Sequence, residues 1–271
     1  MTKIKKAIKQ LRKTIFYRTS HFWPDKMYLC ITYWLLMGGK LDLSNPKGFN
    51  EKLNWLKLYD RNPLFVRLAD KYEVKQFVAD VIGKEYVVPN LGVWDRIEDI
   101  DFDSLPNQFV IKGTHDSSGA TICRDKKSFD VQALAKKYEP IMNRNYFWMW
   151  REWPYKNIKP RVIADTFLDD HTAEGRSISL RDYKFWCFNG EPRYMYCTVK
   201  DKNIYENFYD GDFKPVDINH GFPRHKPEFE KPTDFEKIWQ RLVKQRLCVL
   251  IFLMLKEGFI LANSHSLIGQ D

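Results

Sequence analysis

The fold of this chain is decided by the stretch Asn107-Gln-Phe-Val-Ile-Lys-Gly-Thr-His-Asp-Ser-Ser-Gly-Ala-Thr-Ile-Cys123. Residues 109–111 form a short apolar run with two β-branched side chains, which predicts a buried strand. A small polar loop with glycine at both ends follows, and residues 120–123 predict a second strand. The stretch therefore predicts a hairpin whose flexible tip can lie over a ligand.

The loop of this hairpin has the chemistry of a phosphate-binding site. Gly113 and Gly119 would let backbone N–H groups approach an anion closely. Hydroxyl side chains between them add donors, and Lys112 at the start of the loop adds a point charge. An ordinary hairpin with a polar turn explains the same residues, because the spacing matches neither the Walker A nor the Rossmann pattern. Both interpretations stay open on this stretch alone.

A second hairpin is predicted further along the chain. Residues 181–188 alternate in polarity, Asn189-Gly190 is a strong turn signal, and residues 191–199 return as a strand. Lys184 lies in mid-strand among aromatic residues, and a buried lysine requires an anion, which favours a phosphate contact. Two β-rich segments joined near residues 161–168 predict two lobes with a cleft between them.

Helical patterns occupy much of the remaining sequence. Apolar spacing, capping residues and glycine stops predict helices over residues 25–36, 51–58, 65–81 and 129–142. A short strand is predicted over residues 86–88, before Pro89.

Composition limits the class of protein and of partner. Lys and Arg number 44 and Asp and Glu 35, so the formal net charge is +9, which suits an anionic partner. Hydrophobic residues make up 44% and aromatic residues 15%, which excludes a disordered chain. The five cysteines include no CxxC pair, which fits a reducing cytoplasm and argues against a zinc site.

The first residues are basic and show no signal-peptide pattern. Residues 3–13 hold six basic residues, with apolar residues at helical spacing through Ile15. This pattern predicts either an amphipathic helix on an anionic membrane, through residues 3–15, or a solvated helix that covers the domain. The apolar run of residues 28–37 is too short to span a bilayer.

Several short motifs in a fixed order resemble the TupA-like ATP-grasp family over about residues 25–235. They are Leu41-Asp-Leu43, Asn45-Pro46, Phe49-Asn-Glu-Lys52, Asp70-Lys71, Phe109-Val-Ile-Lys112 with Thr114-His-Asp-Ser117, Asp182-Tyr-Lys-Phe185 and Cys187-Phe-Asn-Gly190. The resemblance implies an α+β fold, with two lobes that grip ATP between antiparallel sheets and a helical N-terminal region. It divides the chain into a basic and aromatic N-terminal region (1–45), a pre-ATP-grasp region (46–106), ATP-grasp-like lobes (107–235) and an atypical tail (236–271).

The resemblance also implies a nucleotide site. Lys112 and Lys184 would contact the phosphates from the small and the large lobe, beneath a flexible loop of residues 113–119. Residues 165–168 would form the hinge whose main chain reads the adenine edge, although the family commonly has glutamate where this chain has Asp165. His115 would orient a phosphate or, as we prefer, stabilise the loop. The implied nucleotide-binding residues are Lys112, Gly113, Thr114, His115, Ser117, Ser118, Gly119, Asp165, Phe167, Leu168 and Lys184.

The activity implied by the resemblance is ATP-dependent ligation. ATP-grasp ligases phosphorylate a carboxylate to an acylphosphate, which an amine then attacks, with Mg²⁺ on the phosphates. The family is found in teichuronopeptide, capsular and lipopolysaccharide gene clusters, so the implied substrate is an acidic sugar or peptide of the cell envelope. The expected location is the cytoplasm, at the inner face of the membrane, and no nucleic-acid partner is expected.

The tail departs from the family pattern. The family holds its Mg²⁺ with carboxylates in late strands that read like RVDF and GRIYFGE, and this chain has neither, so no metal ligand is assigned. A shifted reading frame can be started at the third base of the Cys248 codon. In that frame, the degenerate codons of residues 248–252 permit the first motif and those of residues 256–263 permit the second. This predicts a one-frame slip between about Pro232 and Leu247, with the last sheet strands missing and turnover absent or very small. The alternative is a genuine divergent apolar helix over residues 242–255.

Two other functions remain open from the sequence. A glycosyltransferase of capsular or lipopolysaccharide assembly would need a metal-binding Asp-x-Asp pair, and both Asp101-Phe-Asp103 and Asp210-Gly-Asp212 have that spacing. We prefer to place the first pair in an acidic surface linker and the second in a turn. A non-catalytic nucleotide-binding scaffold would fit the missing metal carboxylates.

Overall fold

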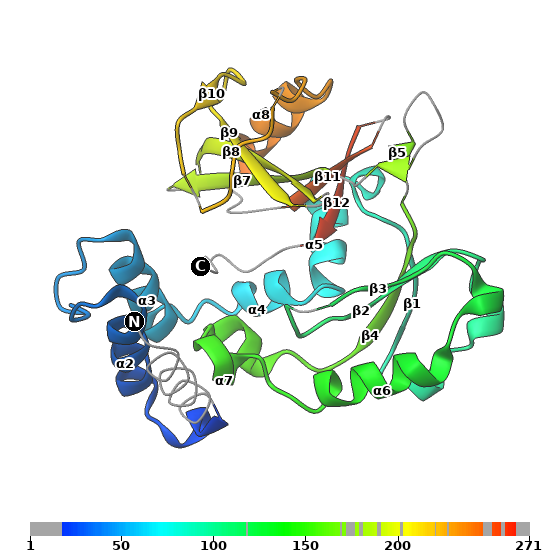
Figure 1. The fold of residues 1–271 in the computed structure, drawn as a ribbon, viewed down its shortest axis with the longest axis horizontal. Helices are drawn as coiled ribbons and strands as arrows, with labels where there is room; N and C mark the ends of the chain where they lie inside the picture. Colours follow the sequence, from blue (N-terminus) through cyan, green and yellow to red (C-terminus); the bar gives the residue numbers. More distant parts are fainter. Residues whose placement is uncertain are drawn as a thin grey trace.

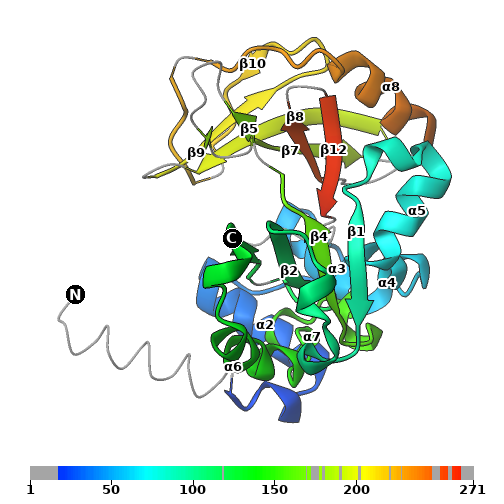
Figure 2. The same cartoon turned by 90° about the vertical axis from the view of Figure 1, so that its right-hand side faces the viewer.

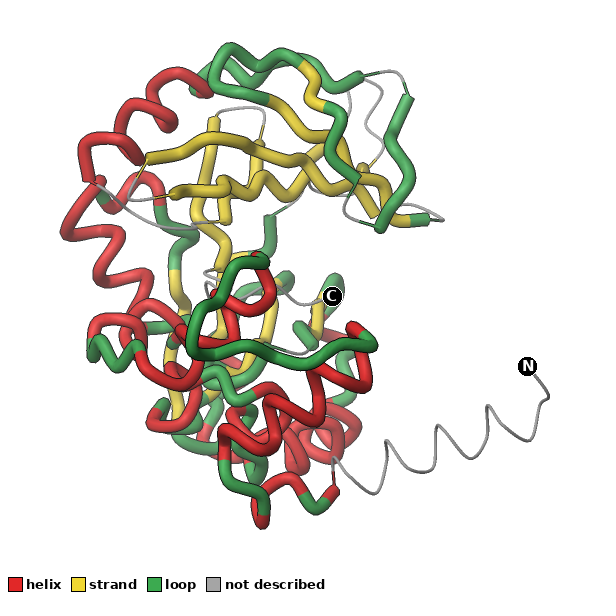
Figure 3. The backbone as a smooth tube through the Cα atoms, turned by 90° about the vertical axis from the view of Figure 1, so that its left-hand side faces the viewer, coloured by secondary structure: helices red, strands yellow, loops and turns green. Residues whose placement is uncertain are grey.

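The structure is a computed structural model of the whole chain. The description covers residues 18–117, 119–168, 170–171, 177–178, 181–188, 191–200, 203–219, 221–226, 228–245, 251–255 and 258–263. Its two main sheets are entirely antiparallel and lie one above the other in Figures 1 and 2, with helices around the lower one. Figure 3 shows the strands gathered in these two layers and the helices along one side. This is the predicted α+β architecture.

The first sheet has four strands in the order β1-β4-β2-β3. The strands are β1 (Asn90–Trp94), β2 (Phe109–Gly113), β3 (Thr121–Cys123) and β4 (Val162–Thr166). The predicted hairpin is confirmed, because β2 and β3 pair with Phe109 opposite Cys123. Its apolar residues pack on α6 (Val131–Met142), whose Leu134 and Tyr138 are buried against Phe109 and Ile111.

The second sheet has six strands in the order β10-β9-β8-β7-β11-β12. The strands are β7 (Arg181–Phe188), β8 (Glu191–Lys200), β9 (Ile204–Tyr209), β10 (Pro215–Val216), β11 (Ile251–Leu255) and β12 (Gly258–Asn263). The second predicted hairpin is also confirmed, with Tyr183 of β7 opposite Cys197 of β8. Two further short strands, β5 (Asp170–His171) and β6 (Ser177–Ile178), form a small sheet where the chain passes from the first layer to the second.

The helix predicted over residues 65–81 is two helices, α4 (Leu64–Ala69) and α5 (Glu73–Ile82). The break comes at Asp70, whose carboxylate accepts the backbone N–H groups of Tyr72 (2.7 Å) and Glu73 (3.1 Å) and so caps α5. The strand predicted over residues 86–88 is wrong as well. Lys84–Tyr86 is a short 3-10 helix, and β1 begins only at Asn90, after Pro89.

Helix α5 connects the two lobes. Its Val74 and Val78 are fully buried in the core of the second sheet, with Tyr183 and Phe185 of β7. Lys75, beside these two valines on the same helix, reaches Asp165 of the first sheet. Figure 1 accordingly shows α5 between the two sheets, and its side chains contact both of them.

The N-terminal region consists of α2 (Asp25–Met37) and α3 (Phe49–Tyr59), beside α7 (Phe147–Trp150). Buried Arg151 attaches it to the first lobe, because its guanidinium donates to the carbonyls of Ser20 (2.5 Å) and Trp23 (3.2 Å) and pairs with Asp25 (2.7 Å). No helix in the described part of the chain is long and apolar enough to cross a membrane.

The tail forms α8 (Phe235–Gln245) and then strands β11 and β12. The expectation that the last strands are missing is therefore corrected, and so is the alternative of one apolar helix over residues 242–255. Ile-Phe-Leu-Met-Leu and Gly-Phe-Ile-Leu-Ala-Asn are apolar runs suited to strands, and β11 adds to the edge of β7. Neither run contains Asp or Glu, so the strands lie in the sheet without carboxylates.

Candidate functional site

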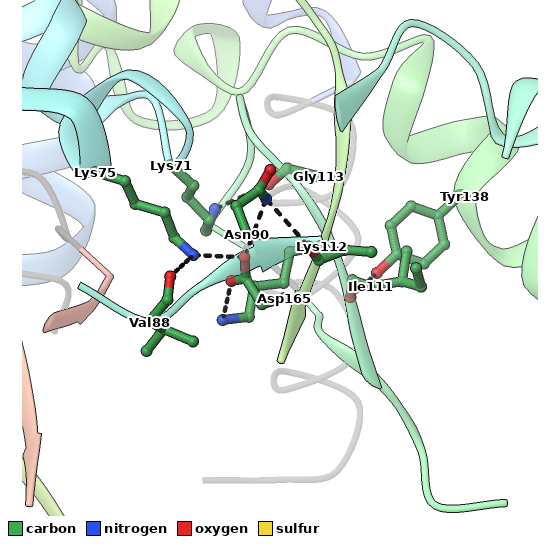
Figure 4. A network of polar contacts seen from close by, with 10 residues as sticks. Lys71, Lys75, Val88, Asn90, Ile111, Lys112, Gly113, Tyr138 and Asp165 are labelled. Atoms are coloured by element: carbon green, nitrogen blue, oxygen red, sulfur yellow. Dashed lines mark hydrogen bonds and ion pairs between the residues drawn. The ribbon is translucent and has the colours of Figure 1, made fainter. Parts of the chain in front are cut away.

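The best-defined polar site of the described chain is centred on Asp165, a buried residue of β4. Its Oδ1 accepts from Lys75 Nζ (2.5 Å) and from Asn90 Nδ2 (3.2 Å), and its Oδ2 accepts from Lys112 Nζ (3.1 Å). Figure 4 shows these side chains converging from α5, β1 and β2. Three separate elements thus meet at one carboxylate.

Strand register explains why these residues meet. Asp165 lies opposite Asn90 of β1 and Val110 of β2, so β4 carries the carboxylate at the centre of the sheet. Burial alternates along β2, and Lys112 falls on the same, less buried face as Val110. Lys75 approaches from α5 and also donates to the carbonyl of Val88 (3.1 Å).

The charges at this site do not cancel. Two lysines share one carboxylate, so the cluster keeps an excess of one positive charge. The Lys75 side chain is only 4% exposed, and burial lowers its pKa while Asp165 opposes that shift. Lys112 is 13% exposed and is the member closest to solvent. Lys112 is thus a cation that retains access to solvent, and the buried Asp165 carboxylate, which also pairs with Lys75, holds it in position. Such a cation is suited to binding an anion.

Lys71 anchors the loop that follows β2. Its ammonium donates to the carbonyls of Gly113 (3.1 Å) and Asp116, and its backbone N–H donates to the carbonyl of Thr114 (3.1 Å). Burial lowers the pKa of Lys71 to about 8, and the negative charge of Asp116 partly offsets this. One buried side chain therefore fixes the start of the predicted phosphate loop at two carbonyls.

The first half of that loop is buried and held in place. Thr114 donates its N–H to the Arg161 carbonyl (2.9 Å), and the His115 Nε2 bonds the Ile141 carbonyl (2.9 Å). The Asp116 carboxylate pairs with Arg144. Burial lowers the pKa of His115, which favours the neutral ring. His115 is thus buried and bonded to the end of α6, and its role at the site stays a prediction. The residues up to Asp116 are held by these contacts.

The second half of the loop is more open. Ser117 is half-buried, Gly119 is exposed, and Ser118 lies outside the described residues. Gly119 has a φ of 65°, a left-handed conformation that favours glycine. The Tyr138 hydroxyl lies within bonding distance of the carbonyls of Gly119 (2.9 Å) and Ile111 (2.7 Å), and burial raises its pKa to about 12. The exposed residues in the described part of the loop are therefore Gly119 and Ala120.

The predicted hinge residues divide into two groups. Asp165 belongs to β4 and is the buried acceptor described above, so it lies inside the sheet. Phe167 and Leu168 follow the strand, are half-buried and begin the passage to the second sheet. The Arg124 guanidinium lies over the Phe167 ring at 5.0 Å. Their proposed role at the adenine edge stays a prediction.

Lys184 lies on β7 of the second sheet, as predicted, in a polar and aromatic setting. Its ammonium is 3.4 Å from the Thr198 hydroxyl, 3.9 Å from an Asp182 carboxylate oxygen and 5.1 Å from the centre of the Tyr196 ring. Its side chain is partly accessible. The sheets thus each carry one accessible, supported lysine, Lys112 on the first and Lys184 on the second.

The Asp-x-Asp pairs serve local structure. Asp101 accepts the N–H of Asp103 (3.1 Å) at the start of a 3-10 turn. Asp210 accepts the N–H groups of Asp212 (3.0 Å) and Lys214 (2.8 Å) in the turn before β10. Within the described ranges, no three His, Cys, Asp or Glu side chains gather as metal ligands.

Sequence reasoning missed three members of this site, namely Lys71, Lys75 and Asn90. A signal for Lys71 was present, because Asp70-Lys71 is one of the motifs of the resemblance, but no role had been attached to it. Lys75 lies between Val74 and Val78 on a helix, and a lysine among buried apolar residues indicates a buried ion pair. Asn90 gave no usable signal, since its role depends on strand register.

Comparisons with known proteins agree with this architecture. A sequence model of the family described as TupA-like ATPgrasp matches residues 51–242. Similar solved structures include a D-alanine–D-alanine ligase from Bacillus anthracis complexed with ATP (12% identity, 74% of this chain and 55% of that chain, TM-score 0.43). An L-amino acid ligase from Bacillus licheniformis (9%, 92% and 54%, 0.46) and a RimK domain protein ATP-grasp from Sphaerobacter thermophilus (10%, 78% and 63%, 0.42) are also similar. This chain thus spans 54–63% of the length of these three structures, and no curated protein matches it.

Proposed function

This chain belongs to the TupA-like ATP-grasp family, and from that premise we propose that it is an ATP-binding, ligase-like protein of cell-surface polysaccharide biosynthesis. The excess positive charge around Asp165 is the observation that carries the proposal. A lysine that a buried carboxylate holds in place, and that solvent still reaches, is suited to binding a triphosphate. Transfer of the phosphoryl group depends on positioning and on neutralisation of charge.

The residues present fit a nucleotide. Lys112 and Lys184 would bind the phosphates from the two sheets, together with Ser117, Ser118 and Gly119 of the loop that follows β2. The main chain of residues 165–168 would hold the adenine, and Mg²⁺ would accompany the phosphates. When bound, ATP supplies the phosphoryl group that activates a carboxylate as an acylphosphate for attack by an amine. The protein's own residues would hold the phosphates, neutralise their charge and limit the access of water.

The proposed second substrate is an acidic sugar or peptide of the cell envelope. Two of the similar structures are named as a D-alanine–D-alanine ligase and an L-amino acid ligase, and the word ligase in this proposal follows those names. The net charge of +9 suits an acidic acceptor. We place the reaction in the cytoplasm, at the inner face of the membrane that residues 3–15 would contact, in capsule or teichuronopeptide assembly.

We further propose that this polypeptide is catalytically impaired because its tail is translated out of frame. The family match ends at residue 242, inside the interval of residues 232–247 in which the codon pattern places the slip. Strands β11 and β12 extend the second sheet beside β7 but contain no carboxylate. The chain would then bind ATP but turn it over very slowly or not at all, and in the second case it would act as a non-catalytic scaffold.

Restoring the frame tests both proposals. The gene is resequenced across codons 230–250, and a version with the shifted frame restored is assayed for ADP release with candidate acidic sugars and amino acids. We expect the restored protein to release ADP only when both a carboxylate and an amine are present. The Lys112→Met variant of the restored protein should release none. Restored protein that neither binds nor cleaves ATP would refute the ligase proposal. A continuous frame in independent DNA would refute the slip alone.

A thermal-shift comparison separates the ligase from the glycosyltransferase alternative. We expect Mg·ATP to raise the unfolding temperature of the present chain and a UDP-sugar to leave it unchanged. Protection by the UDP-sugar alone would favour a glycosyltransferase, despite the turn-forming roles of both Asp-x-Asp pairs.

A further inference from the structure

The net positive charge of the chain is concentrated at one end. Residues 1–60 hold 12 Lys and Arg residues against four Asp and Glu residues, a balance of +8 out of the chain's +9. All four of these acids are already engaged. Asp25 pairs with buried Arg151, and the carboxylates of Asp42, Glu51 and Asp60 accept backbone N–H groups. Such asymmetry indicates a surface that meets an extended anionic partner.

The same region exposes an unusual amount of apolar surface. Of the 17 large apolar side chains exposed in the described part of the chain, nine fall within residues 22–59. Phe22 is 77% exposed and Trp34 60% exposed. The remaining eight are spread over both lobes, from Leu64 to Phe222, so among the described residues the exposed apolar side chains are most concentrated in the N-terminal helices.

Helix α2 explains how this patch arises. Only two of its 13 residues, Asp25 and Lys26, are charged, so it is apolar on nearly every side. One side is buried through Tyr28, Leu29 and Thr32. A helix that is apolar all round is normally covered on all sides, and this one is covered on one side only.

The uncovered side forms a continuous face. Met27 and Trp34 are two turns apart and Met37 follows one turn later, so helical spacing places them on the side opposite the buried residues. Half-buried Cys30 and Ile31 lie between them at the same spacing. Lys26 is exposed at the start of this face. We call these six residues the α2 outer face.

We propose that the α2 outer face docks on an anionic lipid surface. Apolar and aromatic side chains would enter the boundary between head groups and acyl chains, and Lys26, with the other basic residues of the first 60, would attract the anionic head groups. Stable attachment to a membrane requires two such signals together, and this region supplies both. Tryptophan is favoured at that boundary because its ring is apolar and its N–H is polar.

Charge favours a lipid surface over a second copy of this chain. Two copies docked through this face would bring together two N-terminal regions that each carry a sequence balance of +8 over residues 1–60, which is repulsive. A bilayer with anionic lipid presents the opposite sign. The inference extends beyond residues 3–15, because α2 belongs to the folded domain and is fixed to it by Arg151, and so orients the domain on the membrane.

The test is flotation of the full chain with vesicles, which requires no ATP and so stands apart from the ligase proposal. The vesicles are phosphatidylcholine with about one third phosphatidylglycerol, and phosphatidylcholine alone. The variant is Trp34→Ser with Met37→Ser. The matched control is Ile122→Ser, which removes an equally exposed apolar side chain from β3 of the first lobe. Thermal melts check that all forms fold, and light scattering measures their oligomeric state.

We expect the parent chain and the control to float with phosphatidylglycerol-containing vesicles only. The double variant is expected to bind about tenfold more weakly, because two apolar side chains no longer enter the bilayer. Equal flotation of the double variant would overturn the proposal, since the basic residues alone would then suffice. Absence of flotation in every form, or a parent dimer that the double variant dissociates, would overturn it in favour of no partner or of a second copy.

Discussion

The ion cluster at Asp165 leads to a sharp prediction for the variant Lys75→Met. Methionine keeps the length and apolar stem of lysine but removes the ammonium that lies 2.5 Å from Asp165 Oδ1 and 3.1 Å from the Val88 carbonyl. The Asp165 side chain is 1% exposed, so water cannot replace the lost partner. It retains Lys112 and Asn90, which limits the damage.

The magnitude follows from these contacts. Breaking a buried ion pair costs about 3–5 kcal/mol when the remaining charge is orphaned. Here the carboxylate keeps two of its three partners, so we expect the lower end, about 3 kcal/mol of unfolding free energy. For a chain of this size that corresponds to a fall of roughly 6–12 °C in unfolding temperature. Exposed Lys84 on the neighbouring turn provides the control, and Lys84→Met should cost no more than about 0.5 kcal/mol.

Urea denaturation of a double-mutant cycle measures the pair itself. Lys75→Met, Asp165→Asn and the double variant are compared with the parent chain. Because the two side chains are in contact, the double variant should lose at least about 1 kcal/mol less than the sum of the single losses. A Lys75→Met loss below about 1 kcal/mol, or strict additivity, would refute the claim that this pair supports the site.

The same variant should weaken nucleotide binding. Once Lys75 is gone, Asp165 neutralises Lys112 alone, and the excess positive charge of the cluster disappears. ATP affinity, measured by calorimetry on the folded variant, should therefore fall while that of Lys84→Met stays at the parent value. Unchanged ATP affinity in Lys75→Met would contradict this charge argument.

Three further predictions concern buried charges. Burial lowers the pKa of Lys71 to about 8, so the unfolded chain binds more protons between about pH 8 and 10.5, and stability should rise with pH over that range. Urea titrations should show this rise in the parent chain, and an equal rise in Lys71→Met would contradict it. Burial also lowers the pKa of His115, so stability should fall as the pH drops below about 6.5, and His115→Gln should flatten that fall in pH-dependent melts. Arg151→Met should cost about 3 kcal/mol or more and expose residues 18–37 to limited proteolysis, whereas proteolysis at the parent rate would show that Arg151 does not hold the N-terminal region.

Much of the fold was predictable because local signals agreed with the final structure. Alternating polarity around Lys184 and the turn at residues 189–190 predicted the β7–β8 hairpin, and the apolar run at residues 109–111 predicted β2. The failures occurred where a tertiary contact overrode a local pattern. The helical period from Phe65 to Val81 continues through Asp70, but that residue caps a new helix and lets Lys71 leave the helix to bind the loop.

The cationic residues of the candidate site could be predicted from the sequence, whereas the residues that hold them in place could not. Lys112 and Lys184 stood out as charges beside apolar strands, and the glycines marked the loop between β2 and β3. The burial of Thr114 and His115 could not be predicted, because their partners, Arg161 and Ile141, lie far along the chain. For the same reason Asp165 was assigned to a hinge, since only strand register places it beside Asn90.

The central claim is that lysines from two sheets bind one triphosphate. Its most direct test is a calorimetric titration of Mg·ATP into the parent chain, Lys112→Met, Lys184→Met and the control Lys84→Met. Each charge-assisted contact to a phosphate contributes about 1.5–3 kcal/mol, so each of the first two variants should bind ATP roughly ten- to hundredfold more weakly, with the control unchanged. Parent-like affinity in either Lys112→Met or Lys184→Met would contradict the claim.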